Sequence, residues 1–236
     1  RFLMNIKCVG SGSKGNAYLV TDGFTTLLIE CGLPFRKIQE ACKFKTSQIA
    51  ACLITHEHKD HCLCVKEILK RGIETIATYG TWQALDIDPF HTPYTSMIIP
   101  YKTIRKRGTF EIMAFDTQHD AAQPCGYLIY STETGEKLLY LTDSYYCKYK
   151  FEGLTDIMIE CNYDDQTLIN SDDVASLKKR VLRSHLSLDN CIEFLKSNDI
   201  KGVDCIHLIH LSDRNSDEER MKSKVAEATG KRVVVF

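Results

Sequence analysis

The stretch Thr55-His56-Glu57-His58-Lys59-Asp60-His61 decides how this chain is interpreted, because it gathers histidines and acidic residues directly behind an apolar segment. That segment, residues 51–54, reads Ala-Cys-Leu-Ile and is typical of a short strand buried on both faces. Side chains alternate along an extended chain, so His56 and His58 point to the same side of the strand end. Asp60 and His61 follow where the chain turns into a helix. Neutral imidazole and carboxylate groups suit zinc and similar divalent ions, so the stretch predicts a metal site.

A polar surface turn that happens to contain histidines is the alternative explanation. The whole chain has eight histidines, and three of them fall within six positions beside an aspartate. Chance rarely concentrates them in this way, and we therefore favour the metal site.

The composition indicates an ordinary globular protein. The chain has 236 residues, 44% of them hydrophobic, and no low-complexity linker or change of composition interrupts it, so we expect one domain over residues 1–236. Its net charge is −1, with 30 Lys and Arg against 31 Asp and Glu. This balance argues against binding nucleic acid through bulk positive charge, although a local basic patch is compatible with it.

We expect a cytoplasmic protein with no membrane-spanning segment. No apolar run approaches the ~20 residues needed to cross a bilayer, and no secretory leader is visible. The eleven cysteines are scattered, several within apolar strand-like segments, which is typical of buried thiols in a reducing compartment. The pair Cys62 and Cys64 suggests a thiolate site, but a single Cys-x-Cys is weak evidence, and we expect both residues on the helix after His61.

The pattern of apolar residues predicts an α/β chain. Strands dominate the first two thirds, where a glycine-rich loop at residues 10–16 separates the first two strands. The last third alternates strands at residues 156–160, 203–209 and 232–236 with helices at residues 171–182, 188–196 and 217–228. His-Leu-Ser-x-x-Asn occurs twice there, starting at His185 and His210, which are 25 residues apart. The repeat is too short to prove a duplication, but it places two histidines at the ends of similar units.

His56-x-His58-x-Asp60-His61 resembles the signature of the metallo-β-lactamase superfamily. Further motifs make the chain similar to the YycJ/WalJ-like group of that superfamily, whose members are described as DNA-processing metal hydrolases: Gly-Ser-Gly-Ser-Lys-Gly-Asn at residues 10–16, Leu-Ile-Glu-Cys-Gly at residues 28–32, His-Asp-Ala-Ala at residues 119–122, Thr142-Asp143 and the two His-Leu-Ser-x-x-Asn copies. The resemblance implies the α/β class with a four-layer αββα sandwich, in which two mixed β-sheets are flanked by helices and the metals lie at one edge of the sheets.

The resemblance also implies the ligands of two divalent metal ions, with zinc or manganese expected. His56, His58 and His119 are then assigned to one ion, and Asp60, His61 and His210 to the other, with Asp143 between them. A hydroxide that bridges the metals would be the nucleophile. His207 competes with His210 for the last ligand position, and we favour His207 as a core histidine because it lies within the apolar strand at residues 203–209.

One position departs from the family pattern. Glu30 stands where the family usually has an aspartate that supports a metal ligand. Glutamate is one methylene longer, so we expect this support to be rearranged but not lost.

The expected catalytic residues are Asp60, Asp143 and His185, and the expected substrate-binding residues are Ser13, Asn16, His185 and Asn162. His185 precedes a predicted helix start that would attract an anion, and it could protonate a leaving oxygen. The alternative is a surface histidine that caps the helix. Ser13 and Asn16 lie in the glycine-rich loop, which is either a phosphate-binding loop or only a tight turn.

We predict a metal-dependent phosphodiesterase, with a nuclease acting on DNA or RNA as the leading function. Hydrolysis of small cyclic nucleotides is the main alternative, because the chain is short and nearly neutral. Hydrolysis of thioesters or lactones and a non-catalytic metal-binding module are less favoured. The resemblance also suggests a homodimer, although the sequence shows no clear interface.

Overall fold

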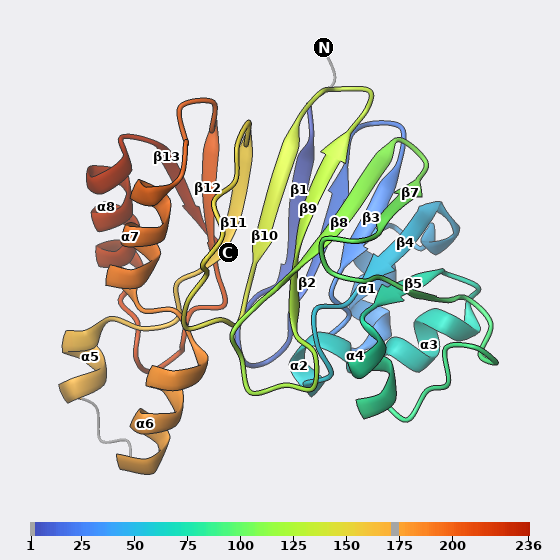
Figure 1. The fold of residues 1–236 in the computed structure, drawn as a ribbon, viewed down its shortest axis with the longest axis horizontal. Helices are drawn as coiled ribbons and strands as arrows, with labels where there is room; N and C mark the ends of the chain where they lie inside the picture. Colours follow the sequence, from blue (N-terminus) through green and yellow to red (C-terminus); the bar gives the residue numbers. More distant parts are fainter. Residues whose placement is uncertain (1–2, 171–174) are drawn as a thin grey trace. The chain divides into compact units, whose positions relative to one another are not determined.

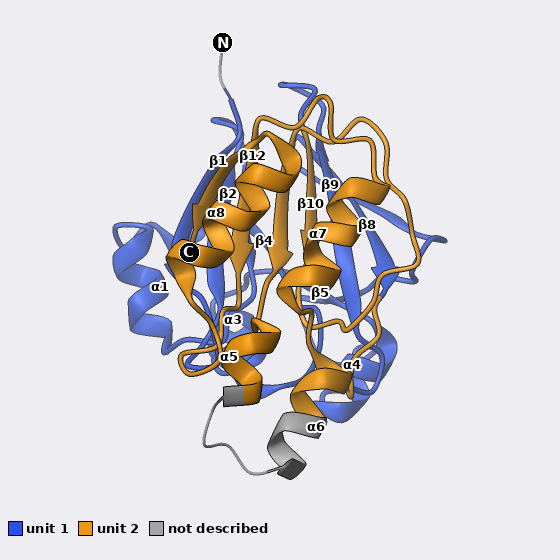
Figure 2. Cartoon of the chain, turned by 90° about the vertical axis from the view of Figure 1, so that its left-hand side faces the viewer, with its two compact units in different colours: residues 1–116, 121–136 blue, residues 117–120, 137–236 orange. Residues whose placement is uncertain are grey.

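The structure is a computed structural model in which residues 3–170 and 175–236 are described (Figure 1). The strands form two mixed β-sheets flanked by helices, as the resemblance implied. The chain divides into two compact units (Figure 2). Unit 1 comprises residues 1–116 and 121–136, and unit 2 comprises residues 117–120 and 137–236. The single domain expected from the sequence stays a prediction.

Unit 1 contains a sheet of six strands in sequential order. The strands are β1 (Asn5–Gly10), β2 (Ala17–Thr21), β3 (Thr26–Ile29), β4 (Ile49–Leu53), β5 (Thr75–Ala77) and β6 (Thr95–Met97). The first three strands are antiparallel neighbours, and β3 to β6 run parallel to one another. The parallel strands carry the predicted metal-binding stretch, because β4 ends two residues before Thr55.

The same unit holds three antiparallel strands: β7 (Ile104–Arg107), β8 (Phe110–Asp116) and β9 (Cys125–Ser131). Its helices are short: α1 (Phe35–Ala41), the 3-10 turn η1 (Thr46–Gln48), α2 (Lys59–Cys62), α3 (Val65–Lys70) and α4 (Tyr79–Ala84). One apolar core includes Leu28 of β3, Cys52 of β4 and Ile68 of α3, none of which is exposed to solvent. This core holds the end of β4 and the start of α2 in place.

Unit 2 contains four parallel strands in the order β10-β11-β12-β13. They are β10 (Lys137–Leu141), β11 (Asp156–Glu160), β12 (Cys205–Ile209) and β13 (Arg232–Val235). The helices are α5 (Asp165–Asn170), α6 (Ala175–Ser184), α7 (Leu188–Ser197) and α8 (Glu218–Thr229), and α8 packs against α7 and β13. Parallel strands that alternate with helices explain the nearly continuous apolar character of β11 and β12.

The elements with strong periodicity lie where the sequence predicts them, and the short strand expected at residues 51–54 overlaps β4. The helices expected at residues 188–196 and 217–228 correspond to α7 and α8. The helix expected at residues 171–182 corresponds to α6, although residues 171–174 lie outside the described residues. The helix expected after His61 is divided into α2 and α3, with Cys62 in α2 and Cys64 at the start of α3. The three-residue strand β5 and the short helix α4 were not predicted, because segments of three to six residues are too short to show a period.

Within the described residues, no helix is long and apolar enough to cross a membrane. All eleven cysteines are free thiols, and only Cys8, Cys42 and Cys147 are partly exposed. The cysteines therefore contribute to the apolar core, as expected.

Candidate metal centre

In unit 1, residues 56–61 form a compact cluster at the end of β4. The chain stays extended up to His58 (φ −62°, ψ 144°) and then forms the single helical turn of α2. The backbone N–H of His61 donates to the carbonyl of His58 at 2.9 Å. The ring centroid of His56 lies 4.6 Å from that of His58 and 4.2 Å from that of His61. One carboxylate oxygen of Asp60 lies 3.4 Å from Nε2 of His61, so this unit brings the four predicted ligands of the stretch together.

Glu30 supports two of these histidines. Its side chain is fully buried at the end of β3, with a left-handed backbone (φ 61°). The Thr55 hydroxyl donates to its carboxylate at 2.6 Å and lies 2.9 Å from Nδ1 of His56. The same carboxylate lies 3.4 Å from Nδ1 of His61. The longer side chain thus reaches His61 directly and His56 through Thr55, which fits the expected rearrangement of this support.

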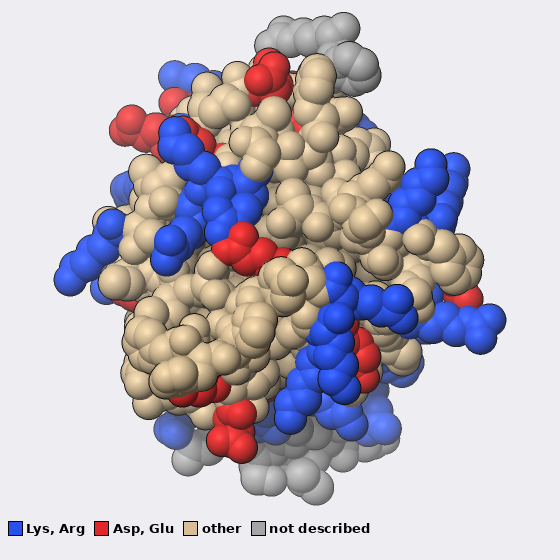
Figure 3. Space-filling model, turned by 90° about the vertical axis from the view of Figure 1, so that its right-hand side faces the viewer, with Lys and Arg blue, Asp and Glu red and all other residues tan. Residues whose placement is uncertain are grey.

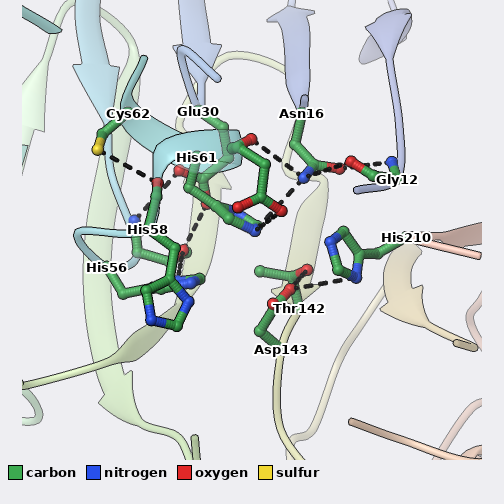
Figure 4. A network of polar contacts seen from close by, with 12 residues as sticks. Gly12, Asn16, Glu30, His56, His58, His61, Cys62, Thr142, Asp143 and His210 are labelled. Carbon is green, nitrogen blue, oxygen red and sulfur yellow. Dashed lines mark hydrogen bonds and ion pairs between the residues drawn. The ribbon is translucent and has the colours of Figure 1, made fainter. Parts of the chain in front are cut away.

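The glycine-rich loop is tied to the helix that carries Asp60 and His61 (Figure 4). Asn16 is fully buried, and its side-chain N–H groups donate to the carbonyls of Gly12 and Asp60, each at 3.2 Å. Its amide nitrogen also lies 3.3 Å from Nε2 of His61. Through these contacts Asn16 holds the glycine-rich loop and the imidazole of His61 in position. Ser13 is exposed at the loop surface, and the substrate role predicted for both residues stays a prediction.

Gly32 makes the close approach of the loop and α2 possible. A Cβ atom at this position would overlap the carbonyl group of Asp60. Gly32→Ala is therefore expected to push α2 away and to lower the free energy of unfolding by about 1–3 kcal/mol, as overpacking usually does. The displaced Asp60 and His61 should also lower the metal content of the purified variant, measured by elemental analysis.

Gly135→Ala is the matched control for this prediction. A Cβ at Gly135 would meet no atom within 4 Å, so only the left-handed backbone (φ +75°) opposes the substitution. This variant should lose some stability but keep its metal. Wild-type metal content in Gly32→Ala would show that α2 tolerates the extra methyl group and would contradict the prediction.

In unit 2, three predicted residues surround the carboxylate of Asp143. Nε2 of His119 lies 3.6 Å from it, Nδ1 of His185 3.8 Å and Nδ1 of His210 3.5 Å. Asp143 is buried and also accepts a hydrogen bond from the Thr142 hydroxyl at 2.7 Å. Asp143, which the resemblance implied as the residue between the metals, thus lies among three imidazole rings, and its role as a metal ligand stays a prediction.

Glu160 is the residue of this cluster that sequence reasoning missed. It ends β11, is fully buried, and its carboxylate lies 2.6 Å from Nδ1 of His185 and 3.1 Å from Nδ1 of His210. The other carboxylate oxygen accepts backbone N–H groups from Ser144 and Leu186, each at 3.0 Å. An acidic residue at the end of an otherwise apolar strand, Asp-Ile-Met-Ile-Glu, was the available signal, since buried carboxylates require partners.

The electrostatics of the cluster follow from these contacts. Burial alone would lower the pKa of His185, but the adjacent Glu160 carboxylate outweighs it and the pKa is raised. Burial would likewise raise the pKa of Glu160, yet the charge and hydrogen bond of His185 hold it below its usual value. Both shifts favour an ion pair between the imidazolium form of His185 and the carboxylate of Glu160. Burial lowers the pKa of His119, which favours the neutral imidazole that a metal ligand needs.

The repeated His-Leu-Ser-x-x-Asn motif has a structural basis. In each copy the serine hydroxyl accepts the backbone N–H of the asparagine three residues later: Asn190 to Ser187 at 3.1 Å and Asn215 to Ser212 at 3.3 Å. The rings of His185 and His210 stack with their centroids 5.4 Å apart. The two copies thus present their histidines to Glu160 in the same way.

Asn162 connects the two copies. Its backbone N–H donates to the carbonyl of Leu186, and its own carbonyl accepts the N–H of Ser212, both at 2.9 Å. The side-chain amide donates to the carbonyl of His210 at 2.8 Å. Asn162 is buried and positions His210, so a direct contact with substrate stays a prediction.

The remaining candidates lie outside this cluster or carry no charge. His207 stacks on Phe236, with ring centroids 4.9 Å apart, and lies 3.7 Å from Asp156, consistent with the core histidine that we expected.

Burial raises the pKa of the Cys62 thiol to about 12, and this thiol donates to the carbonyls of Glu57 and His58. The thiol is protonated at neutral pH and caps the turn of α2, as expected for a residue on this helix.

Comparison with known proteins identifies the family. Residues 25–210 match the model of the Beta-lactamase superfamily domain. The chain belongs to this superfamily. The match begins just before β3 and ends at His210, so it includes all the predicted metal ligands.

Relatives within the superfamily are similar over most of their length. Exodeoxyribonuclease WalJ of Streptococcus pneumoniae serotype 2 (strain D39) is 28% identical over 224 residues, which cover 89% of this chain and 82% of that protein. Exodeoxyribonuclease YycJ of Bacillus anthracis is 24% identical over 235 residues, or 95% of this chain and 88% of that protein. Together with the family match, these relatives confirm the prediction of a metal-dependent hydrolase.

Similarity to a solved structure confirms the fold. The metallo-β-lactamase fold protein YhfI from Bacillus subtilis superimposes with a TM-score of 0.76 and 15% identity, over 99% of this chain and 96% of that chain. Two mixed sheets flanked by helices are thus the metallo-β-lactamase fold, as the sequence motifs predicted.

The residues present fit the divalent metal ions that this superfamily fold implies. In unit 2, Asp143, Glu160, His185 and His210 offer ligand atoms that all lie within 4.8 Å of one another. In unit 1, His56, His58 and His61 form the compact ring cluster described above. Imidazole nitrogens and carboxylate oxygens are the donors that zinc and manganese take in proteins, so the donor chemistry of both units agrees with the family.

Proposed function

We propose that this hydrolase cleaves phosphodiesters and that its substrate is DNA. The observation that carries the proposal is the ion pair of His185 with Glu160 beside Asp143, because it provides a charged proton donor next to a predicted metal ligand. A general acid of this kind is needed when the leaving group is a sugar oxygen, which is a poor leaving group unless it is protonated. The names of the relatives WalJ and YycJ, both exodeoxyribonucleases, agree with this substrate.

The metal ligands in this proposal are those that the family resemblance implies: His56, His58, Asp60, His61, His119, Asp143 and His210. Two divalent ions held by these residues would supply Lewis acidity and an attacking water with a pKa near neutral. Glu30, Thr55 and Asn16 hold the imidazoles of unit 1 in position, and Asn162 and Glu160 do so in unit 2. The identity of the metal stays a prediction, with zinc or manganese expected.

The role of His185 in this proposal follows from its contacts. Its Nδ1 lies 2.6 Å from Glu160, so in the imidazolium form Nδ1–H donates to that carboxylate. Nε2–H is then the proton that the ring can give to a leaving oxygen. Glu160 holds the tautomer and orientation of the ring, much as a carboxylate orients a catalytic histidine in other hydrolases.

Metal content is the first test of the ligand set. The purified protein is expected to carry about two divalent ions per chain, as dinuclear hydrolases of this kind do. His58→Ala should carry fewer, since it removes an imidazole from the cluster of unit 1. His207→Ala is the matched control and should keep the wild-type content, because His207 stacks on Phe236 outside the cluster. Loss of metal from His207→Ala, with full content in His58→Ala, would contradict the assignment.

A panel of substrates tests the proposed function. The metal-loaded protein should hydrolyse bis-p-nitrophenyl phosphate and a DNA oligonucleotide, and it should lose both activities with a chelator. RNA, 3′,5′-cyclic nucleotides and a thioester complete the panel. Efficient turnover of a cyclic nucleotide without cleavage of DNA would favour the alternative of a cyclic nucleotide phosphodiesterase, and turnover of the thioester alone would overturn the proposal.

The distribution of charge bears on how DNA would be bound. On the face shown in Figure 3, Lys and Arg side chains form separate groups, with Asp and Glu side chains between them. This pattern agrees with the net charge of −1 and favours recognition by local contacts over bulk electrostatic attraction. The homodimer suggested by the resemblance stays a prediction.

A further inference from the structure

The segment that follows Asp143 combines exposed aromatic and basic side chains. Residues 145–150 read Tyr-Tyr-Cys-Lys-Tyr-Lys. Tyr145 is 41% exposed and Tyr146 is 57% exposed. Lys148 and Lys150 are exposed as well. Neither the fold nor the proposed metal chemistry requires an exposed aromatic pair at this place.

The backbone of this segment is anchored to the candidate metal centre. Glu160 accepts the N–H of Ser144, and the Ser144 hydroxyl donates to the carbonyl of Tyr146 at 2.8 Å. The N–H of Tyr145 donates to the carbonyl of Gln118 at 3.1 Å, next to His119. The side-chain amide of Asn190, from α7, approaches the carbonyl of Tyr145 at 3.4 Å. The aromatic rings therefore stand on a backbone that is held by the residues around Asp143.

A cavity lies between this segment and α7. Residues 146–150 line one side, and Asn190, Glu193 and Ser197 belong to the other. Its volume is about 150 Å³. Pockets that enclose a small ligand usually have about 300–1,000 Å³. The cavity is thus too small to enclose a nucleotide, but it can take a ring that rests partly on the surface.

We propose that Tyr145, Tyr146 and the adjoining cavity bind unpaired bases of a DNA strand whose phosphate lies at the metal centre. This inference rests on the proposed function and specifies its substrate as a single-stranded end. Bases stack on exposed tyrosine rings whatever their sequence, and nearby lysines contact the phosphates, which is the pattern of single-strand binding sites. Lys148 lies over the ring of Tyr149, 5.0 Å from its centroid, so basic and aromatic groups are interleaved here.

Glu193 lines the same cavity as Lys148 and Lys150, so the cavity wall includes an acidic residue. A negative charge opposes a phosphate but not the face of a base. Bases are therefore expected inside the cavity and phosphates on the side of Lys150. Paired bases do not offer their faces, so duplex DNA should bind more weakly here than a single strand.

The test measures binding of a fluorescent 12-nucleotide oligothymidylate to the metal-loaded full chain by anisotropy, with phosphorothioate linkages that slow cleavage. Tyr145→Ala/Tyr146→Ala is expected to raise the Kd by about 10-fold or more, as loss of one or two stacked bases does. The kcat for bis-p-nitrophenyl phosphate with metal should stay within about twofold of wild type, because the metal ligands are intact. An abasic strand of the same length should bind the wild type and this variant equally.

Two further variants separate stacking from charge. Lys150→Gln should lower the slope of log Kd against log salt by about 1, the contribution of one phosphate contact. Tyr79→Ala/Phe90→Ala is the matched control, because Tyr79 (44% exposed) and Phe90 (68% exposed) form a similar exposed aromatic pair in unit 1. This control should bind the oligonucleotide like the wild type.

The outcomes distinguish this inference from the proposed function. If the wild type binds and cleaves DNA but the Tyr145/Tyr146 variant binds it equally well, the inference is wrong and the proposed function stands. If the wild type with metal hydrolyses bis-p-nitrophenyl phosphate but neither binds nor cleaves DNA, the proposed substrate itself is wrong. Tighter binding of duplex than of single-stranded DNA would also overturn the inference.

Discussion

Asp143→Ala is expected to lower hydrolysis of both activated and unactivated phosphodiesters by about 10³-fold, a loss typical of removing a group that stabilises the reacting charges directly. The carboxylate lies within 3.8 Å of imidazole nitrogens from His119, His185 and His210. Without it, the three imidazoles lose the carboxylate that lies among them, and only Glu160 remains beside His185 and His210. The variant should therefore bind less metal, and both substrates should suffer equally.

The measurement compares kcat/KM for bis-p-nitrophenyl phosphate and for a DNA oligonucleotide, with metal content determined on the same preparation. Asp143→Asn keeps the shape of the side chain and separates loss of charge from a cavity. Thr142 donates its hydroxyl to Asp143, so the asparagine can still be held in place. Near-wild-type activity of Asp143→Asn would contradict a role for the negative charge.

His185→Ala is expected to lower cleavage of DNA by about 10²–10⁴-fold while leaving the metal content unchanged. DNA has a sugar alkoxide as leaving group, which needs a proton, whereas nitrophenolate leaves readily without one. Hydrolysis of bis-p-nitrophenyl phosphate should therefore fall far less. This selective loss distinguishes a proton donor from a metal ligand, whose removal would affect both substrates.

Glu160→Gln is the companion variant for His185. Glutamine still accepts a hydrogen bond but carries no charge, so the imidazolium loses its ion-pair partner at 2.6 Å. Cleavage of DNA should fall in the same selective way, though less than in His185→Ala. If His185→Ala instead loses metal, then His185 is itself a ligand. Its ligand atom lies within 4.8 Å of those of Asp143, Glu160 and His210, so this outcome would contradict its role as a proton donor.

Part of the site could be predicted because it is local in the sequence. His56, His58, Asp60 and His61 lie within six positions, and the alternation of side chains at the end of a buried strand brings such residues together without knowledge of the rest of the fold. His119, Asp143 and His210 were assigned only through the resemblance to a family. The local sequence does not show that His210 reaches the cluster and His207 does not. The two histidines are only three positions apart: His207 lies in β12, and His210 directly follows that strand.

The tertiary structure was needed for the residues that support the ligands. Glu160 and Glu30 are buried only because other elements cover the ends of β11 and β3, and burial forces a carboxylate to find donors in distant parts of the chain. The contacts of Glu160 span 25 residues to His185 and 50 residues to His210. No periodicity within one segment can encode such contacts.

The amino-acid sequence by itself determined the superfamily, the metal chemistry and the strong β/α alternation, because each depends on residue types at short spacing. Only the tertiary structure decided that Asn16 and Asn162 are buried positioning residues and that His185 is paired with a glutamate. It also left Tyr145 and Tyr146 exposed beside Asp143. The physical reason is that burial and exposure are set by long-range packing, whereas a ligand motif is set by the geometry of a single strand end.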